Sequence, residues 1–350
     1  MNRNYLHNID EIFTLKRQIS EIYKYDNIIT QDPRMLEILE MISLVAETES
    51  PILIEGETGT GKELIARAIH QKSPRRNHEF VAINCGALPE TLIEDELFGH
   101  EKGAFTGAIR QRIGKFEVAD KGTLFLDEIE SISMQTQVKL LRVVEQKEFQ
   151  RVGGNENIRA DARIIAASNV DIAQAIESGK FREDLYYRLD VINIKVPPLR
   201  ERKDDIPLLV QHFLRKFINK LHKDVQGISE DALLVLMSYH WPGNVREVAN
   251  VIERIVIMSK DPVITADKIG FLVNSLANGN KSYNGFKFTT SESLHEVRER
   301  AIEAAEREYL SMLLKKFKGD VKLVAEHSGI TPRGIYKKIK SYELRVSDFR

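Results

Sequence analysis

The chain has 350 residues, of which 42% are hydrophobic and 29% charged, so it is long enough for two or three globular domains. The net charge of −1 excludes a general attraction to polyanions, and any nucleic-acid site must be a local basic patch. The single cysteine, Cys85, excludes an internal disulfide and fits a reducing cytosol. With neither a signal peptide nor a membrane-length apolar run in the sequence, we expect a cytoplasmic protein without membrane contact.

Residues 1–25 carry apolar side chains at spacings of three and four, which predicts an amphipathic linker helix. The residues in this stripe are Ile9, Ile12, Leu15, Ile19 and Ile22. A surface helix that docks on the next domain and a short coiled-coil connector both fit this pattern.

Residues 26–196 alternate between short apolar runs and helical patterns, which predicts an α/β subdomain. Strands are expected at residues 52–54, 80–83, 123–126, 164–167 and 191–194. Nearly continuous apolar strands separated by helices are typical of a parallel sheet that is covered on both faces.

The remaining sequence predicts three further segments. Pro197-Pro198 ends the alternating pattern, and residues 197–272 form a helical lid in which Asn244 is the expected N-cap of one helix. Residues 273–292 are rich in Asn, Ser, Gly and Lys, as expected of a flexible linker. Residues 293–350 form an all-α C-terminal domain whose first helix begins with the capping box Ser293-Leu294-His295-Glu296.

A phosphate-binding loop follows the first predicted strand and precedes a helix. Its glycines let backbone N–H groups face phosphate oxygens at a helix N-terminus, and its lysine neutralises the β- and γ-phosphates of ATP. The generic motif ends in a hydroxyl that binds Mg²⁺, but a glutamate stands there, so the metal must rely on Asp127, on water or on that glutamate. The nucleotide-binding residues are Gly56, Glu57, Thr58, Gly59, Thr60, Gly61, Lys62 and Glu63.

Acidic and amide side chains at strand ends complete the predicted ATPase site. Asp127 and Glu128 end an apolar strand, and we assign them to Mg²⁺ and to the attacking water. Asn169 ends the next strand, either as a γ-phosphate sensor or as a turn residue. Arg182 and Arg188 either pair with local acids or act in trans on a neighbouring subunit.

A loop bounded by glycines lies between the two halves of this site. It comprises Gly103, Ala104, Phe105, Thr106, Gly107 and Ala108. The glycines permit a sharp turn, and an exposed Phe is costly unless a partner covers it. The loop is therefore either a contact site for a partner or an ordinary surface loop.

The C-terminal region has the pattern of a helix-turn-helix. Thr331-Pro332 begins its second helix, whose exposed positions include Arg333, Tyr336, Lys337 and Lys340. Residues 315–340 contain eight Lys and Arg against two Asp and Glu, which predicts DNA binding; a packing module with a solvated basic face is the alternative. Gly334 weakens the helix, and close approach to DNA is one reason for it.

Taken together, these motifs closely resemble those of bacterial sigma-54-dependent transcriptional activators, the enhancer-binding branch of the AAA+ ATPases. The resemblance covers residues 26–345, and the hexapeptide at 103–108 is highly specific to that branch. Further matching motifs lie at residues 96–100, 127–129, 196–202 and 241–247.

The resemblance implies an AAA+ P-loop ATPase with a helical lid and a Fis-type helix-turn-helix. Glu63 is usual in this branch. Asn84 is implied to be the switch partner of Glu128, and Arg246 to be a second sensor on the lid. Arg182 and Arg188 are implied to be inter-subunit arginines.

The same resemblance implies partners and a mechanism. Dimers, paired through the 293–317 helix, assemble into a hexameric ring that binds enhancer DNA. Phe105 and Thr106 contact the sigma factor, and ATP hydrolysis converts the closed complex of the sigma-54 RNA polymerase holoenzyme into an open one. Two alternatives stay open, namely a DNA-binding regulator with a vestigial ATPase and an AAA+ remodeller of another target. No sensory domain fits within the first 25 residues, so the input signal is not predicted.

Overall fold

The computed structural model describes residues 28–259, 261–267, 269, 294–342, 344 and 346. The predicted linker helix at 1–25 and the predicted linker at 273–292 lie outside the described residues. The chain divides into two compact units, Met1–Val273 and Asn274–Arg350, which are considered separately below. Within the described part of the chain, no helix combines the length and apolar character needed to cross a membrane.

A five-stranded sheet in the order β2-β5-β8-β1-β9 forms the centre of the first unit, and all of its pairings are parallel. Each predicted strand is present, and each of its limits agrees with the prediction to within one residue. The α/β fold with a parallel sheet is therefore confirmed. The strands are β1 (Ile52–Glu55), β2 (Phe80–Asn84), β5 (Thr123–Asp127), β8 (Arg163–Ser168) and β9 (Ile192–Lys195).

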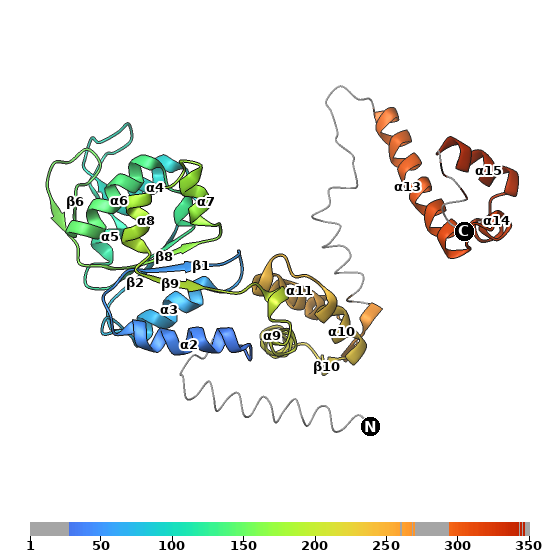
Figure 1. Ribbon diagram of the computed structural model, residues 1–350, viewed down its shortest axis with the longest axis horizontal. Helices are drawn as coiled ribbons and strands as arrows, with labels where there is room; N and C mark the ends of the chain where they lie inside the picture. Colours follow the sequence, from blue (N-terminus) through green and yellow to red (C-terminus); the bar gives the residue numbers. More distant parts are fainter. Residues whose placement is uncertain are drawn as a thin grey trace. The chain divides into compact units, whose positions relative to one another are not determined.

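Helices cover both faces of this sheet (Figure 1). One core lies between the sheet and α2 with α3, and includes Ile42, Ile54 and Ile69. The other lies under α4, α6 and α8, and includes Leu126 and Leu140. Successive strand residues enter opposite cores, so each strand is apolar throughout. The helices are α2 (Pro33–Ala46), α3 (Lys62–Lys72), α4 (Glu90–Phe98), α5 (Lys115–Val118), α6 (Met134–Gln146), α7 (Ile172–Glu177) and α8 (Glu183–Leu189), with the 3-10 turn η1 (Ile129–Ser131).

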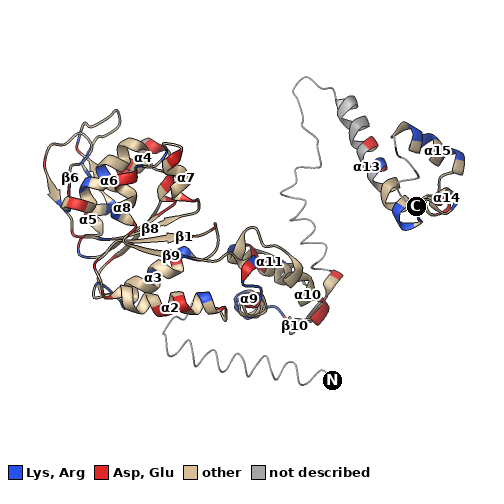
Figure 2. Ribbon diagram, in the orientation of Figure 1, with Lys and Arg blue, Asp and Glu red and all other residues tan. Residues whose placement is uncertain are grey.

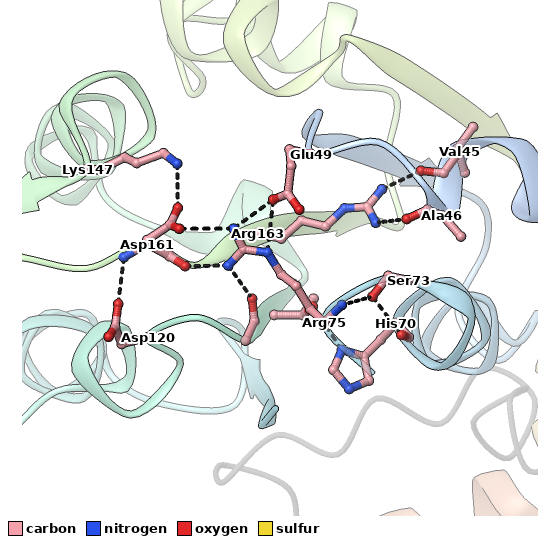
Figure 3. Close-up of polar contacts among 12 residues, drawn as sticks. Val45, Ala46, Glu49, His70, Ser73, Arg75, Asp120, Lys147, Asp161 and Arg163 are labelled. Atoms are coloured by element: carbon pink, nitrogen blue, oxygen red, sulfur yellow. Dashed lines mark hydrogen bonds and ion pairs between the residues drawn. The ribbon is translucent and has the colours of Figure 1, made fainter. Parts of the chain in front are cut away.

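Polar contacts, those of Arg163 among them buried, hold the amino ends of the strands (Figure 3). Arg163 begins β8 and is 2% exposed. Its Nη1 donates to the Ala46 carbonyl at 2.8 Å and its Nη2 to the Val45 carbonyl at 2.6 Å, so it satisfies the last turn of α2. Arg75 binds Glu49 and Asp161 nearby. This network supports the edge of the sheet opposite the phosphate loop.

The lid is helical, as predicted, but Asn244 is not the N-cap of its helix. Gly243 is the N-cap, and Asn244 is the first helical residue with φ 52° and no exposed surface. Its side chain is instead used for contacts with other segments, described below. The lid elements are η2 (Leu199–Glu201), α9 (Asp205–Leu221), β10 (Gly227–Ile228), α10 (Glu230–Ser238), α11 (Asn244–Met258) and β11 (Val263–Ile264).

The second unit contains α13 (Leu294–Lys316), α14 (Val321–Ser328) and α15 (Pro332–Ser341). Its core includes Leu314, Val324 and Ile335, all fully buried. Thr331 caps α15 and Pro332 is its first residue, as predicted. A Cβ on Gly334 would lie 2.8 Å from Cγ2 of Ile330, so tight packing of the turn explains this glycine without DNA.

Candidate functional site

The phosphate loop connects β1 to α3 at the carboxyl edge of the sheet. Gly59 and Gly61 have φ angles of 80° and 107°, which L side chains rarely adopt. The Gly56 amide donates to the Ser168 carbonyl at the end of β8, at 3.2 Å. The loop therefore sits beside the strand ends where the predicted acidic and sensor residues lie.

Lys62 is the first residue of α3 and is 7% exposed. Its ammonium Nζ donates to the Gly56 carbonyl at 2.5 Å and to the Glu57 carbonyl at 3.3 Å. Burial lowers the pKa of Lys62 from its usual 10.5, while the charges of Asp127, Glu130 and Glu128 oppose the shift. A cation held in this loop by backbone carbonyls is placed to meet phosphate oxygens.

Asp127 ends β5, and burial raises the pKa of its carboxyl from the usual 3.8, with the Lys62 charge acting in the opposite direction. Glu128 follows with φ 54° and its amide donates to Asp127 Oδ1 at 3.1 Å. Both carboxylates act on the Lys62 charge, Asp127 more strongly than Glu128, and the left-handed backbone at Glu128 ends the strand directly after Asp127.

Asn84 lies on β2 directly beside Asp127 in the parallel register. Its Oδ1 accepts from the Gly86 amide at 2.9 Å. Glu128 packs on Gly86, where an added Cβ would lie 2.0 Å from Glu128 Oε2. Asn84 and Glu128 thus meet the same short segment after β2, and the predicted switch pairing between them stays a prediction.

Asn169 follows β8, and its backbone N–H donates to Glu130 Oε1 at 3.3 Å. Glu130 Oε2 is buried with no hydrogen-bond partner among the described residues. Glu130 was not among the site residues predicted from the sequence. Its position two residues after the strand-end acid pair was the only available signal.

The lid contacts the phosphate loop directly, and these contacts were not predicted from the sequence. Arg200 binds Glu57 through two Nη–Oε contacts of 2.7 Å each. Asn244 Nδ2 donates to Glu57 Oε2 at 3.2 Å and to the Thr58 carbonyl at 3.1 Å. Gly59 leaves no room for a side chain, since a Cβ would lie 2.3 Å from the Gly243 carbonyl. The loop and the lid are therefore fitted closely together.

The other predicted lid and helix residues fall at the margins of the site. The Arg246 amide donates to the Gly59 carbonyl at 3.3 Å, and the charge of Arg246 acts on Lys62. Glu63 pairs with Arg67 at 2.7 Å. Arg182 pairs with Asp184 at 2.6 Å, as in the local alternative, and Arg188 is exposed on the last turn of α8.

The loop at 103–108 extends from a two-stranded antiparallel ribbon of β3 (Gly99–His100) and β4 (Arg112–Ile113). The Gly103 amide donates to the Ala108 carbonyl at 2.8 Å and closes its base. Phe105 is 45% exposed, with its ring 4.9 Å from that of His100. Gly103 and Gly107 have positive φ angles and open space around them. An aromatic side chain is thus presented at the tip of a narrow loop.

In the second unit, Lys and Arg gather on α15 (Figure 2). All of the predicted DNA-binding side chains on it are exposed, while Ile335 and Ile339 are buried. Lys338 differs from its neighbours because it pairs with Glu306 on α13. The predicted DNA-binding residues are Arg333, Tyr336, Lys337 and Lys340.

Three protein families match successive parts of the chain. They are the sigma-54 interaction domain at residues 28–195, an AAA+ ATPase lid domain at 200–283 and the Fis family of bacterial regulatory proteins at 301–342. The regulatory protein AtoC of Escherichia coli (strain K12) is 41% identical over 97% of this chain and 72% of AtoC. The Nif-specific regulatory protein of Azotobacter vinelandii is 53% identical over 74% of this chain and 50% of its own length.

A solved structure agrees with these relationships. NtrX from Brucella abortus, in complex with ATP, is 34% identical with a TM-score of 0.69, over 95% of this chain and 73% of that one. The chain spans only 50% of the Nif-specific regulatory protein and 61% of the nitrogen fixation protein AnfA of Azotobacter vinelandii. From its sigma-54 interaction domain, AAA+ lid and Fis-type helix-turn-helix, the chain belongs to the family of sigma-54-dependent bacterial transcriptional activators.

Proposed function

We propose that the chain is an ATP-driven transcriptional activator that binds enhancer DNA and remodels the closed complex of the sigma-54 RNA polymerase holoenzyme into an open one. The observation that carries this proposal is the placement of a phosphate loop and of Asp127 with Glu128 at one sheet edge, in the same unit as the exposed loop at 103–108. In such a unit, binding and hydrolysis of the nucleotide can change the position of Phe105 at the tip of the loop.

The residues present fit ATP with Mg²⁺. Among the described residues no group of three or more His, Cys, Asp or Glu is placed to hold a metal, so Asp127 would share Mg²⁺ with phosphate and water oxygens. Burial raises the pKa of the Asp127 carboxyl, and a bound cation would favour its ionised form. Mg²⁺ would supply charge neutralisation at the β- and γ-phosphates.

Each of the remaining site residues has a role in this proposal. Lys62 and the loop amides bind phosphates, and Glu128 orients the attacking water. Asn84 is the switch partner of Glu128, Asn169 senses the γ-phosphate, and Arg246 is a second sensor on the lid. Stabilisation of transition-state charge by an arginine in trans contributes about 10³–10⁵ in rate.

Arg182 and Arg188 require a second subunit to act in trans. Both lie on or beside the short helix α8, and Arg188 is exposed. We therefore propose that the active form is an oligomer, up to a hexameric ring, in the cytoplasm where DNA and RNA polymerase are found. The basic face of α15 binds enhancer DNA, and pairing through α13 matches two half-sites.

ATP turnover per subunit, measured as the protein concentration rises, tests this proposal. We expect the specific rate to increase with assembly, because the arginines act only between subunits. A specific rate that stays constant from fully dissociated to assembled protein contradicts shared sites. Absent turnover in the assembled state would favour the vestigial-ATPase alternative.

A substitution at the loop tip tests the target. Thr106→Ala should leave ATP turnover largely intact and block open-complex formation on a sigma-54 promoter, because Thr106 lies outside the nucleotide site. Ser178→Ala removes an exposed hydroxyl elsewhere and should leave both activities unchanged. Normal open-complex formation by Thr106→Ala would refute the loop assignment and favour another target.

A further inference from the structure

Two buried charged side chains at the start of the lid have no role in the proposed mechanism. Arg202 is 3% exposed and Asp205 is fully buried, and their Nη1 and Oδ2 atoms are 3.7 Å apart. A buried ion pair is a poor source of stability because desolvation offsets its attraction. The function of these two side chains is therefore better explained by the segments that they bind than by their mutual attraction.

Asp205 binds the segment through which the chain enters α2. Its Oδ2 accepts from Thr30 Oγ1 at 2.7 Å, and its Oδ1 accepts from the amides of Gln31 at 2.6 Å and Asp32 at 3.3 Å. Burial raises the pKa of Asp205, while these donors act in the opposite direction. The three donors belong to consecutive residues, so a shift of this entry segment (residues 30–32) must move or break the Asp205 contacts.

Arg34 joins the same two parts of the chain from the next turn. Its Nη1 donates to Glu201 Oε2 at 2.9 Å and its Nη2 to the Glu201 carbonyl at 2.7 Å. These contacts thus connect the entry segment to the start of the lid, although Arg34 and Glu201 are 167 positions apart in the sequence.

Arg202 extends this connection to the phosphate loop. Its Nη2 donates to the Thr60 carbonyl at 3.0 Å. Thr60 is 3% exposed, and its Oγ1 donates to the Glu57 carbonyl at 2.7 Å. The same carbonyl accepts from Lys62 Nζ at 3.3 Å. A series of direct contacts therefore runs from Thr30 to the lysine that is placed for phosphate.

We propose that Arg202 and Asp205 are positioning residues that couple the entry segment to the phosphate loop, so that displacing this segment weakens nucleotide binding. The inference rests on the proposed nucleotide function and assigns a means of regulating that site. By thermodynamic reciprocity, bound nucleotide tightens the contacts of the entry segment in turn.

Equilibrium binding of a fluorescent ADP analogue to the full chain tests the coupling. Thr30→Val removes the hydroxyl donor to Asp205 but keeps the side-chain shape, and we expect Kd to rise about fivefold, because only part of the free energy of a hydrogen bond to a charged group is transmitted to the nucleotide site. Thr30→Ser keeps the donor and should retain the wild-type Kd. Thr48→Val is the matched control, because the Thr48 hydroxyl binds only the Val45 carbonyl within its own turn among the contacts described.

The Thr30→Val, Arg202→Gln double variant separates coupling from general destabilisation. If the effect passes through Arg202, adding Thr30→Val to Arg202→Gln should leave Kd unchanged. A Thr30→Val protein with lowered Tm and wild-type Kd would show a purely structural role and overturn the inference. So would additive effects on Kd in the double variant.

A second comparison distinguishes this failure from failure of the proposed function. Wild-type protein should bind the analogue and Lys62→Ala should not. If the wild type fails to bind it, both proposals are overturned. If the wild type binds and Lys62→Ala does not, a null result for Thr30→Val overturns only the coupling.

Discussion

At the scale of single residues, burial of the ionised Asp127 carboxylate lowers the free energy of unfolding of the protein. Burial raises its pKa above 3.8, so between 3.8 and the raised value the folded state binds more protons than the unfolded state. The stability of the nucleotide-free protein therefore falls as pH rises through this window. The full destabilisation is present at pH values above the raised pKa.

Asp127→Asn should accordingly increase the free energy of unfolding at pH 7 and abolish ATP turnover. Urea unfolding across pH measures the first effect, and the gain should shrink as pH falls towards 3.8. Asp224→Asn changes an exposed carboxyl and should show no such gain. A less stable Asp127→Asn protein at pH 7 would mean that attraction to Lys62 outweighs desolvation.

Gly86 controls the position of Glu128. An alanine Cβ there would lie 2.0 Å from Glu128 Oε2, which is the end of a flexible side chain, so the carboxylate moves while the backbone stays. Gly86→Ala should retain nucleotide affinity and reduce turnover by up to about 10²-fold, the cost of a small misplacement of a reacting group. Steady-state turnover and ADP-analogue binding check both parts.

Gly227→Ala is the matched control for this prediction, because a Cβ at Gly227 has open space around it. It should behave as wild type in both assays. Wild-type turnover by Gly86→Ala would instead show that the position of Glu128 in this structure is not the one that reacts.

At the scale of elements, Arg163 joins β8 to the end of α2. Its Nε is buried without a hydrogen-bond partner among the described residues, and desolvation lowers its pKa. This cost is offset by two hydrogen bonds, which the guanidinium donates to the Ala46 carbonyl at 2.8 Å and to the Val45 carbonyl. The Val45 carbonyl also accepts from Thr48, so removal of Arg163 affects Ala46 most.

Arg163→Met should reduce the free energy of unfolding by about 2 kcal/mol, the cost of leaving a buried carbonyl unsatisfied. Chemical unfolding measures it, with Arg76→Met as an exposed control that should stay within about 0.5 kcal/mol of wild type. An Arg163→Met protein as stable as wild type would show that relief of desolvation compensates for the lost bonds.

At the scale of the whole molecule, short-range patterns in the sequence predicted the strands, the phosphate loop and the helix-turn-helix. Each of these patterns lies within a few consecutive residues, so it can be recognised without a structure. Examples are the apolar runs of β1 and β5 and the Thr331-Pro332 start of α15. The contacts of the lid with the loop were not predicted. Glu57 and Asn244 are 187 residues apart, and no local pattern indicates such a pairing.

Asn244 illustrates the limit of local reasoning. Asn is favoured at N-caps, which motivated the wrong assignment. In the structure its Oδ1 accepts from the Leu199 amide at 2.7 Å while its Nδ2 reaches the phosphate loop, so tertiary contacts outweigh the capping preference. The same side chain thereby connects the lid to the nucleotide site.

The basic face of α15 gives the last prediction, on DNA binding. Lys337 is exposed, whereas Lys338 is paired with Glu306, so only the first is available to a phosphate. Loss of one phosphate contact reduces the slope of log K against log salt by about 0.9. Lys337→Ala should therefore weaken binding to a mixed-sequence DNA duplex and give a shallower slope, as measured by fluorescence anisotropy over a salt series. Lys180→Ala makes the same charge change on an exposed residue of the first unit and should retain the wild-type slope; an unchanged slope for Lys337→Ala would exclude this phosphate contact.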